Sequence, residues 1–243
     1  MGQVIVITSG KGGTGKTTTA ATISSCLAAL GHRTLAIDCD IGLRNLDVSL
    51  AMQDFAVTDF LDVLDGRMTL DEAAHEHPRL PSLFFLAAPT SAAPEDIDMA
   101  KMNALLRTAR AAFDFTILDC PAGLGSGFRL AAASADTAVV VATGEAASLR
   151  DASAAVTRLA EMNISEIRLL INRFDRAHAQ RWRDSIDEMI DDTGAQLIGV
   201  VREDKHVPDA VSGETPLVLH ATGGAALDFL SAARRLTGET VPI

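Results

Sequence analysis

A glycine-rich loop with two lysines follows the first apolar segment of the chain, and it constrains the fold more than any other feature. Gln3–Thr8 has the composition of a buried strand, the loop reads GKGGTGKTT, and a helical pattern then runs to Leu30. This order matches G-x-x-x-x-G-K-[ST] in the strand–loop–helix setting of a phosphate-binding loop. Glycines let successive backbone N–H groups point at phosphate oxygens, and the helix N-terminus adds partial positive charge. The predicted nucleotide-binding residues of the loop are Gly10, Lys11, Gly12, Gly13, Thr14, Gly15, Lys16, Thr17 and Thr18.

Acidic residues close two other apolar segments and complete a predicted catalytic centre. Lys16 is expected to reach the β- and γ-phosphates, and the hydroxyl of Thr17 is expected to coordinate Mg²⁺. Asp119 ends one segment and is the natural residue to bind Mg²⁺, directly or through water. Asp38 and Asp40 end another segment, and on an extended backbone two residues at this spacing would face the same way.

Short β-branched runs alternate with amphipathic helical patterns along all 243 residues. The strand candidates are Gln3–Thr8, Thr34–Asp38, Leu83–Ala88, Phe115–Asp119, Thr137–Ala142, Ile167–Ile171 and Leu197–Val201. Several lack polar alternation, as expected for strands that are buried on both faces. The β-then-α order predicts an α/β fold in which a mostly parallel twisted sheet has helices on both faces. We expect one P-loop domain over residues 1–243, with a capping box at Thr69–Glu72.

Composition argues against several other classes of protein. The formal net charge of −11 disfavours nonspecific DNA binding, because phosphate contacts need a positive field. Three cysteines lie far apart with no C-x-x-C pair, which indicates a reducing compartment and disfavours a disulfide or a zinc site. The N-terminus lacks the features of a signal peptide, and no apolar run is long enough to span a bilayer. We therefore expect a cytoplasmic protein.

Several blocks of the sequence together resemble the ParA/MinD family of P-loop ATPases, whose phosphate loop begins with an extra lysine. Lys11–Thr18 resembles the deviant Walker A loop of this family, and Ile37–Asp47 looks more specifically like its MinD branch, which acts in bacterial division-site selection. Further blocks follow in family order as far as about residue 238. These blocks are Asp119–Gly123, Glu145 with Arg150-Asp151, Asn172-Arg173 and Ile198–Asp204.

The resemblance implies a role for each matching residue. Lys11 would cross a homodimer interface to the nucleotide of the second copy, and Asp40 would orient the attacking water, so the implied catalytic residues are Lys11, Lys16 and Asp40. Asp38 would support the magnesium shell formed with Thr17 and Asp119. The residues implied around the base are Asn172, which would read the adenine edge, with Arg173, Arg202 and Asp204. The residues implied near the dimer and partner surface are Glu145, Arg150 and Asp151.

The resemblance also implies an activity. ATP with Mg²⁺ would build a nucleotide-sandwich homodimer, and slow, partner-stimulated hydrolysis to ADP would reverse it. The implied partner is a regulatory protein of the division-inhibitor or activator type. Two departures stand out: Arg202 replaces a usual proline, and Thr143-Gly144 replaces a usual Asn-Pro.

The end of the chain bears on membrane binding. Relatives in the MinD branch usually finish with a linker and a basic amphipathic helix that enters the membrane. Here Ala226, Leu227, Leu230 and Ala233 share one face at core spacing, so we expect a core helix and no membrane-targeting helix. Attachment to the inner face of the cell membrane stays open.

Two other functions also stay open. A ParA-like DNA-partitioning ATPase would need a basic surface, for which the candidates are Arg168, Arg173, Arg176, His178, Arg181 and Arg183; a solvated surface is the plainer interpretation. A metabolic relative, such as an iron–sulfur carrier or an anion pump, could use the same loop. The absent cysteine pairs count against cluster carriers, and the absence of tyrosine excludes a kinase with an autophosphorylated tyrosine tail.

Overall fold

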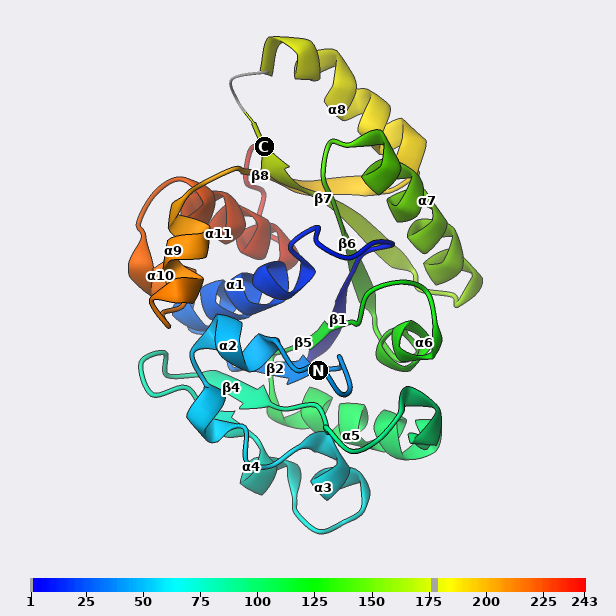
Figure 1. Cartoon of the computed structure of the whole chain (residues 1–243), viewed down its shortest axis with the longest axis vertical. Coiled ribbons are helices and arrows are strands. Elements are labelled where there is room, and N and C mark those ends of the chain that lie inside the picture. Colours follow the sequence, from blue (N-terminus) through cyan, green and yellow to red (C-terminus); the bar gives the residue numbers. More distant parts are fainter. Residues whose placement is uncertain (1, 176–178) are drawn as a thin grey trace.

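The computed structural model describes residues 2–175 and 179–243, with the backbone alone for residues 179–185, and within these ranges eight strands form one sheet (Figure 1). The strands are β1 (Gln3–Thr8), β2 (Thr34–Asp38), β3 (His75–Glu76), β4 (Leu83–Leu86), β5 (Phe115–Asp119), β6 (Thr137–Ala142), β7 (Glu166–Phe174) and β8 (Gln196–Arg202). Their order is β3-β4-β2-β5-β1-β6-β7-β8, and each neighbouring pair is parallel except β3 with β4. The predicted α/β fold is confirmed.

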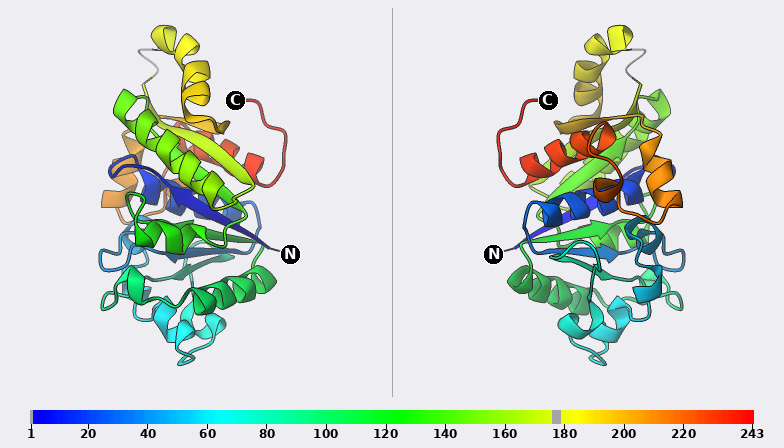
Figure 2. Two further views of the ribbon diagram at one scale, coloured as in Figure 1. Left: turned by 90° about the vertical axis from the view of Figure 1, so that its right-hand side faces the viewer. Right: turned by 90° about the vertical axis from the view of Figure 1, so that its left-hand side faces the viewer.

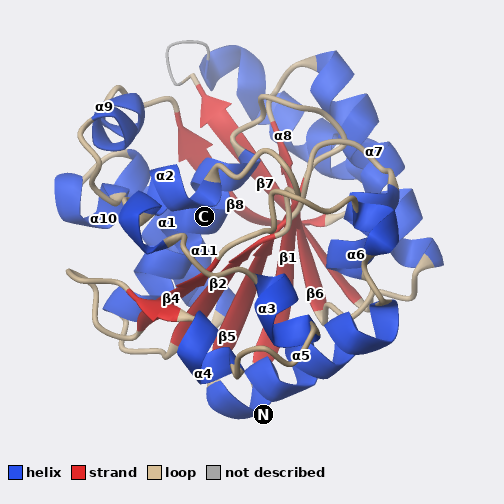
Figure 3. Cartoon of the chain, turned by 60° about the horizontal axis from the view of Figure 1, so that its bottom comes forward, coloured by secondary structure: helices blue, strands red, loops and turns tan. Residues whose placement is uncertain are grey.

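Two layers of helices cover the sheet because its central strands are apolar on both faces. In β1, Val4 and Val6 pack on one side, Ile5 and Ile7 pack on the other, and all four are fully buried. One layer holds α1 (Lys16–Ala29), α2 (Leu46–Leu50), α9 (His206–Ser212), α10 (Leu217–His220) and α11 (Ala225–Leu236). The other layer holds α3 (Phe60–Leu64), α4 (Leu70–Ala73), α5 (Met99–Ala112), α6 (Ser126–Ala132), α7 (Ala146–Glu161) and α8 (Ala179–Thr193). Figures 2 and 3 show these helices around the strands; the 3₁₀ turns are η1 (Gln53–Phe55) and η2 (Pro94–Asp96).

The last helix, α11, packs as a core helix, as predicted, but with a shifted face. Ala225, Phe229 and Ala232 are buried against α1 and β8, whereas Leu227 is 49% exposed. The predicted stripe is therefore wrong at Leu227, because the buried face follows i, i+4 and i+7 from Ala225. No helix in the described part of the chain has the length and apolar character needed to cross a membrane.

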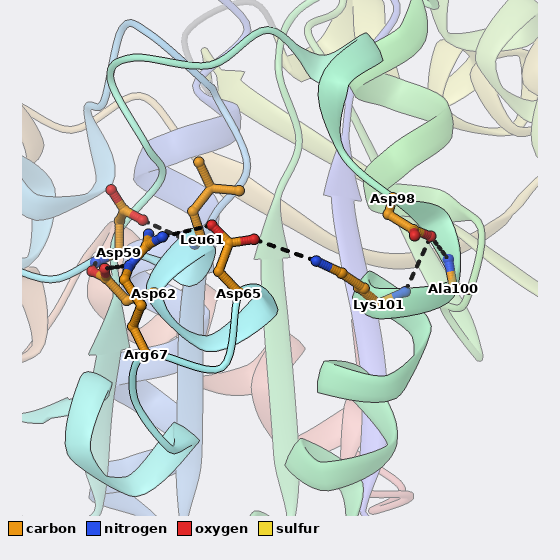
Figure 4. A network of polar contacts seen from close by, with 8 residues as sticks. All are labelled: Asp59, Leu61, Asp62, Asp65, Arg67, Asp98, Ala100 and Lys101. Atoms are coloured by element: carbon orange, nitrogen blue, oxygen red, sulfur yellow. Dashed lines mark hydrogen bonds and ion pairs between the residues drawn. The ribbon is translucent and has the colours of Figure 1, made fainter.

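Capping and ion pairs fix the helices that lie between β2 and β5. The predicted capping box of α4 is present, since the Thr69 amide donates to Glu72 Oε2 at 2.8 Å and the Glu72 amide donates to Thr69 Oγ1 at 3.3 Å. Arg67 and Lys101 both pair with Asp65, at 2.6 and 3.4 Å, which joins the end of α3 to α5 (Figure 4). Because these charged groups are exposed, their pairs orient the helices more than they stabilise them.

A buried histidine connects the β3–β4 turn to the end of α2. His77 Nδ1 lies 3.0 Å from the amide nitrogens of both Arg79 and Leu80, and Nε2 lies 2.9 Å from the carbonyl oxygen of Leu50. Since an amide can only donate, Nδ1 is the acceptor and the proton sits on Nε2. A second proton on Nδ1 would break two hydrogen bonds, and burial, together with Arg79, lowers the pKa of His77.

This arrangement predicts a pH-dependent stability. Unfolded chains bind a proton at His77 near pH 6.5, but the folded protein resists it, so the contribution of His77 to the free energy of unfolding should fall below about pH 6.5, by up to about 1.4 kcal/mol per pH unit. His77→Ala should remove this contribution and change the slope between pH 7 and pH 5 in urea unfolding, whereas exposed His220→Ala should preserve the slope. An unchanged slope in His77→Ala would contradict the assignment.

Candidate functional site

The phosphate loop joins β1 to α1 at the carboxyl edge of the parallel strands, where ligands of such sheets bind. Gly13 and Gly15 have positive φ angles of 84° and 90°, which residues with side chains rarely adopt. A Cβ atom on Gly10 would lie 2.0 Å from the carbonyl oxygen of Asp151, and one on Gly15 would lie 2.3 Å from Nδ2 of Asn172. Conformation and close contact therefore both require these glycines, as a phosphate-binding loop does.

Charged side chains from three elements meet beside this loop. Burial raises the pKa of Asp119 to about 7 and also raises the pKa of Asp40, while the positive charge of Lys16 lowers both. Lys16 itself is only 9% exposed. Asp38 and Asp119 are register partners in β2 and β5, so their carboxyl groups end neighbouring strands. The structure thus brings together the four residues that the sequence analysis assigned to one centre, which are Lys16, Asp38, Asp40 and Asp119.

Unpaired buried oxygens in this centre fit a hard cation. Among the described residues, neither carboxylate oxygen of Asp119 nor the Thr14 hydroxyl has a hydrogen-bond partner. The Thr17 hydroxyl lies close enough to Asp119 to lower its pKa, but it does not reach hydrogen-bond geometry. Such oxygens suit Mg²⁺, which binds one or two protein ligands and takes the rest from phosphates and water. No group of three or more His, Cys, Asp or Glu side chains in the described ranges could hold a metal alone.

The unpaired carboxylate predicts an opposite effect of one substitution on stability and on binding. Because its pKa stays raised even beside Lys16, the charged form of Asp119 is less favourable here than in water. Asp119→Asn should therefore stabilise the nucleotide-free protein at pH 8, by roughly 1–3 kcal/mol in urea unfolding. The same variant should lose the gain in ATP affinity that Mg²⁺ gives to the unaltered protein. A variant that is less stable without ligand would contradict this account.

Asp38 is placed differently from Asp119, because both of its oxygens already accept hydrogen bonds. Oδ1 accepts from the Asp40 amide at 2.8 Å, and Oδ2 accepts from the amides of Asn45 and Leu46, each at 3.1 Å. These bonds shape the loop before α2 and satisfy the first amides of that helix. Strand β2 ends at Asp38, so Asp40 lies beyond the extended backbone on which the same-face prediction depended. Asp38 therefore organises the segment that carries Asp40, and its place in the magnesium shell stays a prediction.

A bulge near the end of β7 positions the residues predicted at the base. The pairing of β7 with β8 shifts between Ile171 and Phe174, and Arg173 has a positive φ of 55°. Asn172 is buried, and its Nδ2 donates to the carbonyl oxygen of Thr14 at 2.8 Å. A carbonyl oxygen can only accept, so the Asn172 side chain must turn its Nδ2 group toward Thr14. The Oδ1 atom of Asn172 is then directed away from Thr14 and can act as an acceptor. An acceptor beside the phosphate loop is what the exocyclic amine of adenine requires.

Two cavities flank the loop. The larger, of about 480 Å³, is lined by Lys11, Gly12, Gly13, Thr14 and Glu145 among others. The smaller, of about 290 Å³, extends from Gly15 and Thr18 to Asn172, Arg173, Arg202 and Asp204. Lys11 is exposed and lines the larger cavity, and Arg150 is exposed on α7. Of Glu145, Arg150 and Asp151, the three residues predicted near the dimer and partner surface, only Glu145 lines either cavity. The backbone of Asp151 packs on Gly10.

The far wall of the smaller cavity follows β8. Asp204 Oδ1 accepts from the His206 amide at 3.0 Å, and Oδ2 accepts from the Ala225 amide at 2.9 Å. Burial alone would raise the pKa of Asp204, but these bonds and the His206 ring outweigh it and lower the pKa to about 2. Asp204 thus holds the starts of α9 and α11 beside the cavity. Sequence reasoning missed the apolar lining residues Val207, Pro208, Val211 and Phe229, although the end of β8 marks their place.

Two arginines of the predicted basic patch, Arg168 and Arg173, lie on the same strand, β7. Arg168 lies near the amino end of β7, paired with Glu166 at 2.7 Å, whereas Arg173 lies at the carboxyl end beside the cavities. Arg176 and His178 lie outside the described residues, as do the side chains of Arg181 and Arg183. The two described arginines therefore lie toward opposite ends of β7.

Comparisons with known proteins agree with this geometry. A family model of the CobQ/CobB/MinD/ParA nucleotide-binding domain matches residues 5–217. The septum site-determining protein MinD of Bacillus subtilis is 39% identical over 252 residues, covering 100% of this chain and 92% of the relative. The MinD structure in the MinC:MinD cell division protein complex of Aquifex aeolicus has a TM-score of 0.91 at 36% identity, covering 99% of this chain and 98% of that one. MinD of Pyrococcus horikoshii, solved with Mg-ADP, has a TM-score of 0.84 at 27% identity, covering 97% and 96%.

Proposed function

The chain belongs to the CobQ/CobB/MinD/ParA family of nucleotide-binding proteins, and on this basis we propose that it is a MinD-type ATPase switch. ATP with Mg²⁺ builds a nucleotide-sandwich homodimer, and slow hydrolysis to ADP, stimulated by a partner, dissolves it. The observation that carries this proposal is the pair of lysines around the loop. Lys16 is buried in the centre, whereas Lys11 is exposed and lines the larger cavity, so its charge remains available to a second copy.

Different residues of the site have different roles in the proposed ATPase switch. The loop amides and Lys16 bind the phosphates, and Thr17 with Asp119 would hold Mg²⁺, which neutralises phosphate charge when bound. Asp40, held near Lys16 by the bond from its amide to Asp38, orients the attacking water. Lys11 of each copy places its charge at the phosphates of the other, where charge develops during transfer. Leu43 and Val57, 73% and 79% exposed, offer apolar surface in and beside the segment Ile37–Asp47, because Arg44 donates to the carbonyl oxygen of Ala56.

We propose that the protein is cytoplasmic and acts in division-site selection, with a regulatory protein as its partner. The relative from Aquifex aeolicus was solved in complex with MinC, which supports a partner of the division-inhibitor type. Attachment to the inner face of the membrane is a second part of this proposal, and vesicle sedimentation with ATP tests it. DNA partitioning has less support, given the net charge of −11 and the separation of Arg168 from Arg173 along β7.

Lys11→Ala separates dimerisation from nucleotide binding. The variant should bind ATP within about threefold of the unaltered protein, because Lys16 and the loop amides remain, but it should stay monomeric with ATP. Light scattering and equilibrium ATP titration measure the two properties. Lys101→Ala is the matched control, since Lys101 pairs with Asp65 and lines neither cavity. An ATP-dependent dimer of normal strength in Lys11→Ala would rule out the proposed role.

A further inference from the structure

An arginine at the end of β8 is fastened to the last helix by a bidentate ion pair. Arg202 Nε lies 2.6 Å from Asp228 Oδ2, and Nη2 lies 2.7 Å from Oδ1. The Arg202 amide also donates to Oδ2 at 3.1 Å. Asp228 lies in the first turn of α11, which Asp204 already holds beside the cavity. Three hydrogen bonds from one residue to one carboxylate fix both the backbone and the guanidinium plane.

The ion pair leaves part of the guanidinium free toward the cavity. Asp228 occupies the Nε–Nη2 edge, and Nη1 has no hydrogen-bond partner among the described residues. Arg202 lines the smaller cavity together with Val207, Pro208 and Phe229. The Arg202 side chain keeps 31% of its surface exposed, against 14% for Asp228. The Asp228 carboxylate is thus largely enclosed and fixes the position of Arg202, while the Arg202 side chain stays partly exposed.

The cavity has the form of a base site that begins at the phosphate loop. One end is Gly15 and Thr18, beside the phosphate-binding residues, and the rest of the lining includes apolar side chains together with two arginines, Arg173 and Arg202. Planar guanidinium groups stack on flat aromatic rings, and fixing the group beforehand lowers the entropy lost on binding. A nucleobase is the flat ring that a ligand with phosphates at the loop would bring here.

We propose that Arg202, held by Asp228, covers the base of the bound nucleotide with its guanidinium plane and thereby determines how tightly the base is held. The proposal rests on the proposed function, because it takes the ligand to be ATP. Arg202 is a binding residue for the base, and Asp228 is a positioning residue that acts through it. The contribution belongs to the base alone, so it should be absent for a ligand that has phosphates only.

The test compares ATP with inorganic triphosphate, each with Mg²⁺, by competition against a fluorescent ADP analogue. Arg202→Met, which keeps the length of the side chain, should weaken ATP binding by roughly three- to thirtyfold and leave triphosphate binding unchanged. Arg202→Lys should behave similarly, because lysine can keep the charge and a bond to Asp228 but lacks the plane. Asp228→Asn should show a smaller loss for ATP alone. Arg234→Ala is the control, since Arg234 lies on the same helix as Asp228, pairs with Glu239 beyond the end of that helix, and lines neither cavity.

The outcomes are distinct. An equal loss for ATP and triphosphate in Arg202→Met would mean that the pair only supports the fold, and it would overturn the inference. Unchanged ATP affinity in both Arg202 variants would overturn it as well. Failure of the unaltered protein to bind ATP would instead overturn the proposed function, and the inference with it.

Discussion

Replacement of Lys16 by alanine is expected to abolish ATP binding at micromolar concentrations. The lysine is buried beside Asp40 and Asp119, so its removal takes the positive charge from the phosphate site and leaves two carboxylates facing the ligand. Loss of one partner from a buried charged contact costs roughly 2–5 kcal/mol, which is about thirty- to several-thousandfold in affinity. Calorimetric titration with Mg-ATP measures the change.

The control for this substitution is Lys101→Ala, which removes an exposed lysine from the contacts in Figure 4. It should bind ATP like the unaltered protein, and circular dichroism should show that both variants are folded. Affinity in Lys16→Ala within threefold of the unaltered value would mean that the loop does not bind phosphate as described.

Asp40→Ala should keep ATP binding and lose hydrolysis. The carboxylate is half-buried near Lys16, past the end of β2, where it can orient a water molecule without being needed to hold the phosphates. Groups that direct proton transfer or water contribute roughly 10²–10⁴-fold, so turnover should fall by at least about a hundredfold. Because hydrolysis would dissolve the proposed dimer, the variant should remain dimeric with ATP. Phosphate release and light scattering on the same sample measure both effects.

Asp54→Ala offers a matched control, because Asp54 is an exposed aspartate in η1 that lines neither cavity. It should hydrolyse ATP at the unaltered rate and leave the dimer transient. Normal turnover in Asp40→Ala would remove Asp40 from the proposed mechanism, while loss of ATP binding would mean that it supports the phosphate site.

Much of the sheet could be predicted because burial on both faces leaves an unbroken apolar run. The strands β1, β2, β5 and β6 have the predicted bounds. The predicted Leu83–Ala88 ends at Leu86 in β4, and β3 was missed, since two residues of an antiparallel edge strand carry no readable period. The edges of the sheet were thus less predictable than its centre.

The site could be predicted as far as the phosphate loop and the strand ends, because those positions follow from local pattern and topology. The hydrogen bonds of Asp38 could not, since they depend on the path of the loop after β2. The pairing of Arg202 with Asp228 joins residues 26 positions apart, so no local signal reveals it. Arg168 and Arg173 were grouped by closeness in sequence, but an extended strand separates them.

The central claim is that ATP converts a monomer of 25.6 kDa into a dimer. Light scattering of the unaltered protein in Mg²⁺, with ATP and then with ADP, tests it most directly. The account predicts a mass near twice the monomer with ATP, which returns to the monomer mass as ATP is consumed or when ADP replaces it. A monomer mass at saturating ATP, with binding shown on the same sample, would contradict the account.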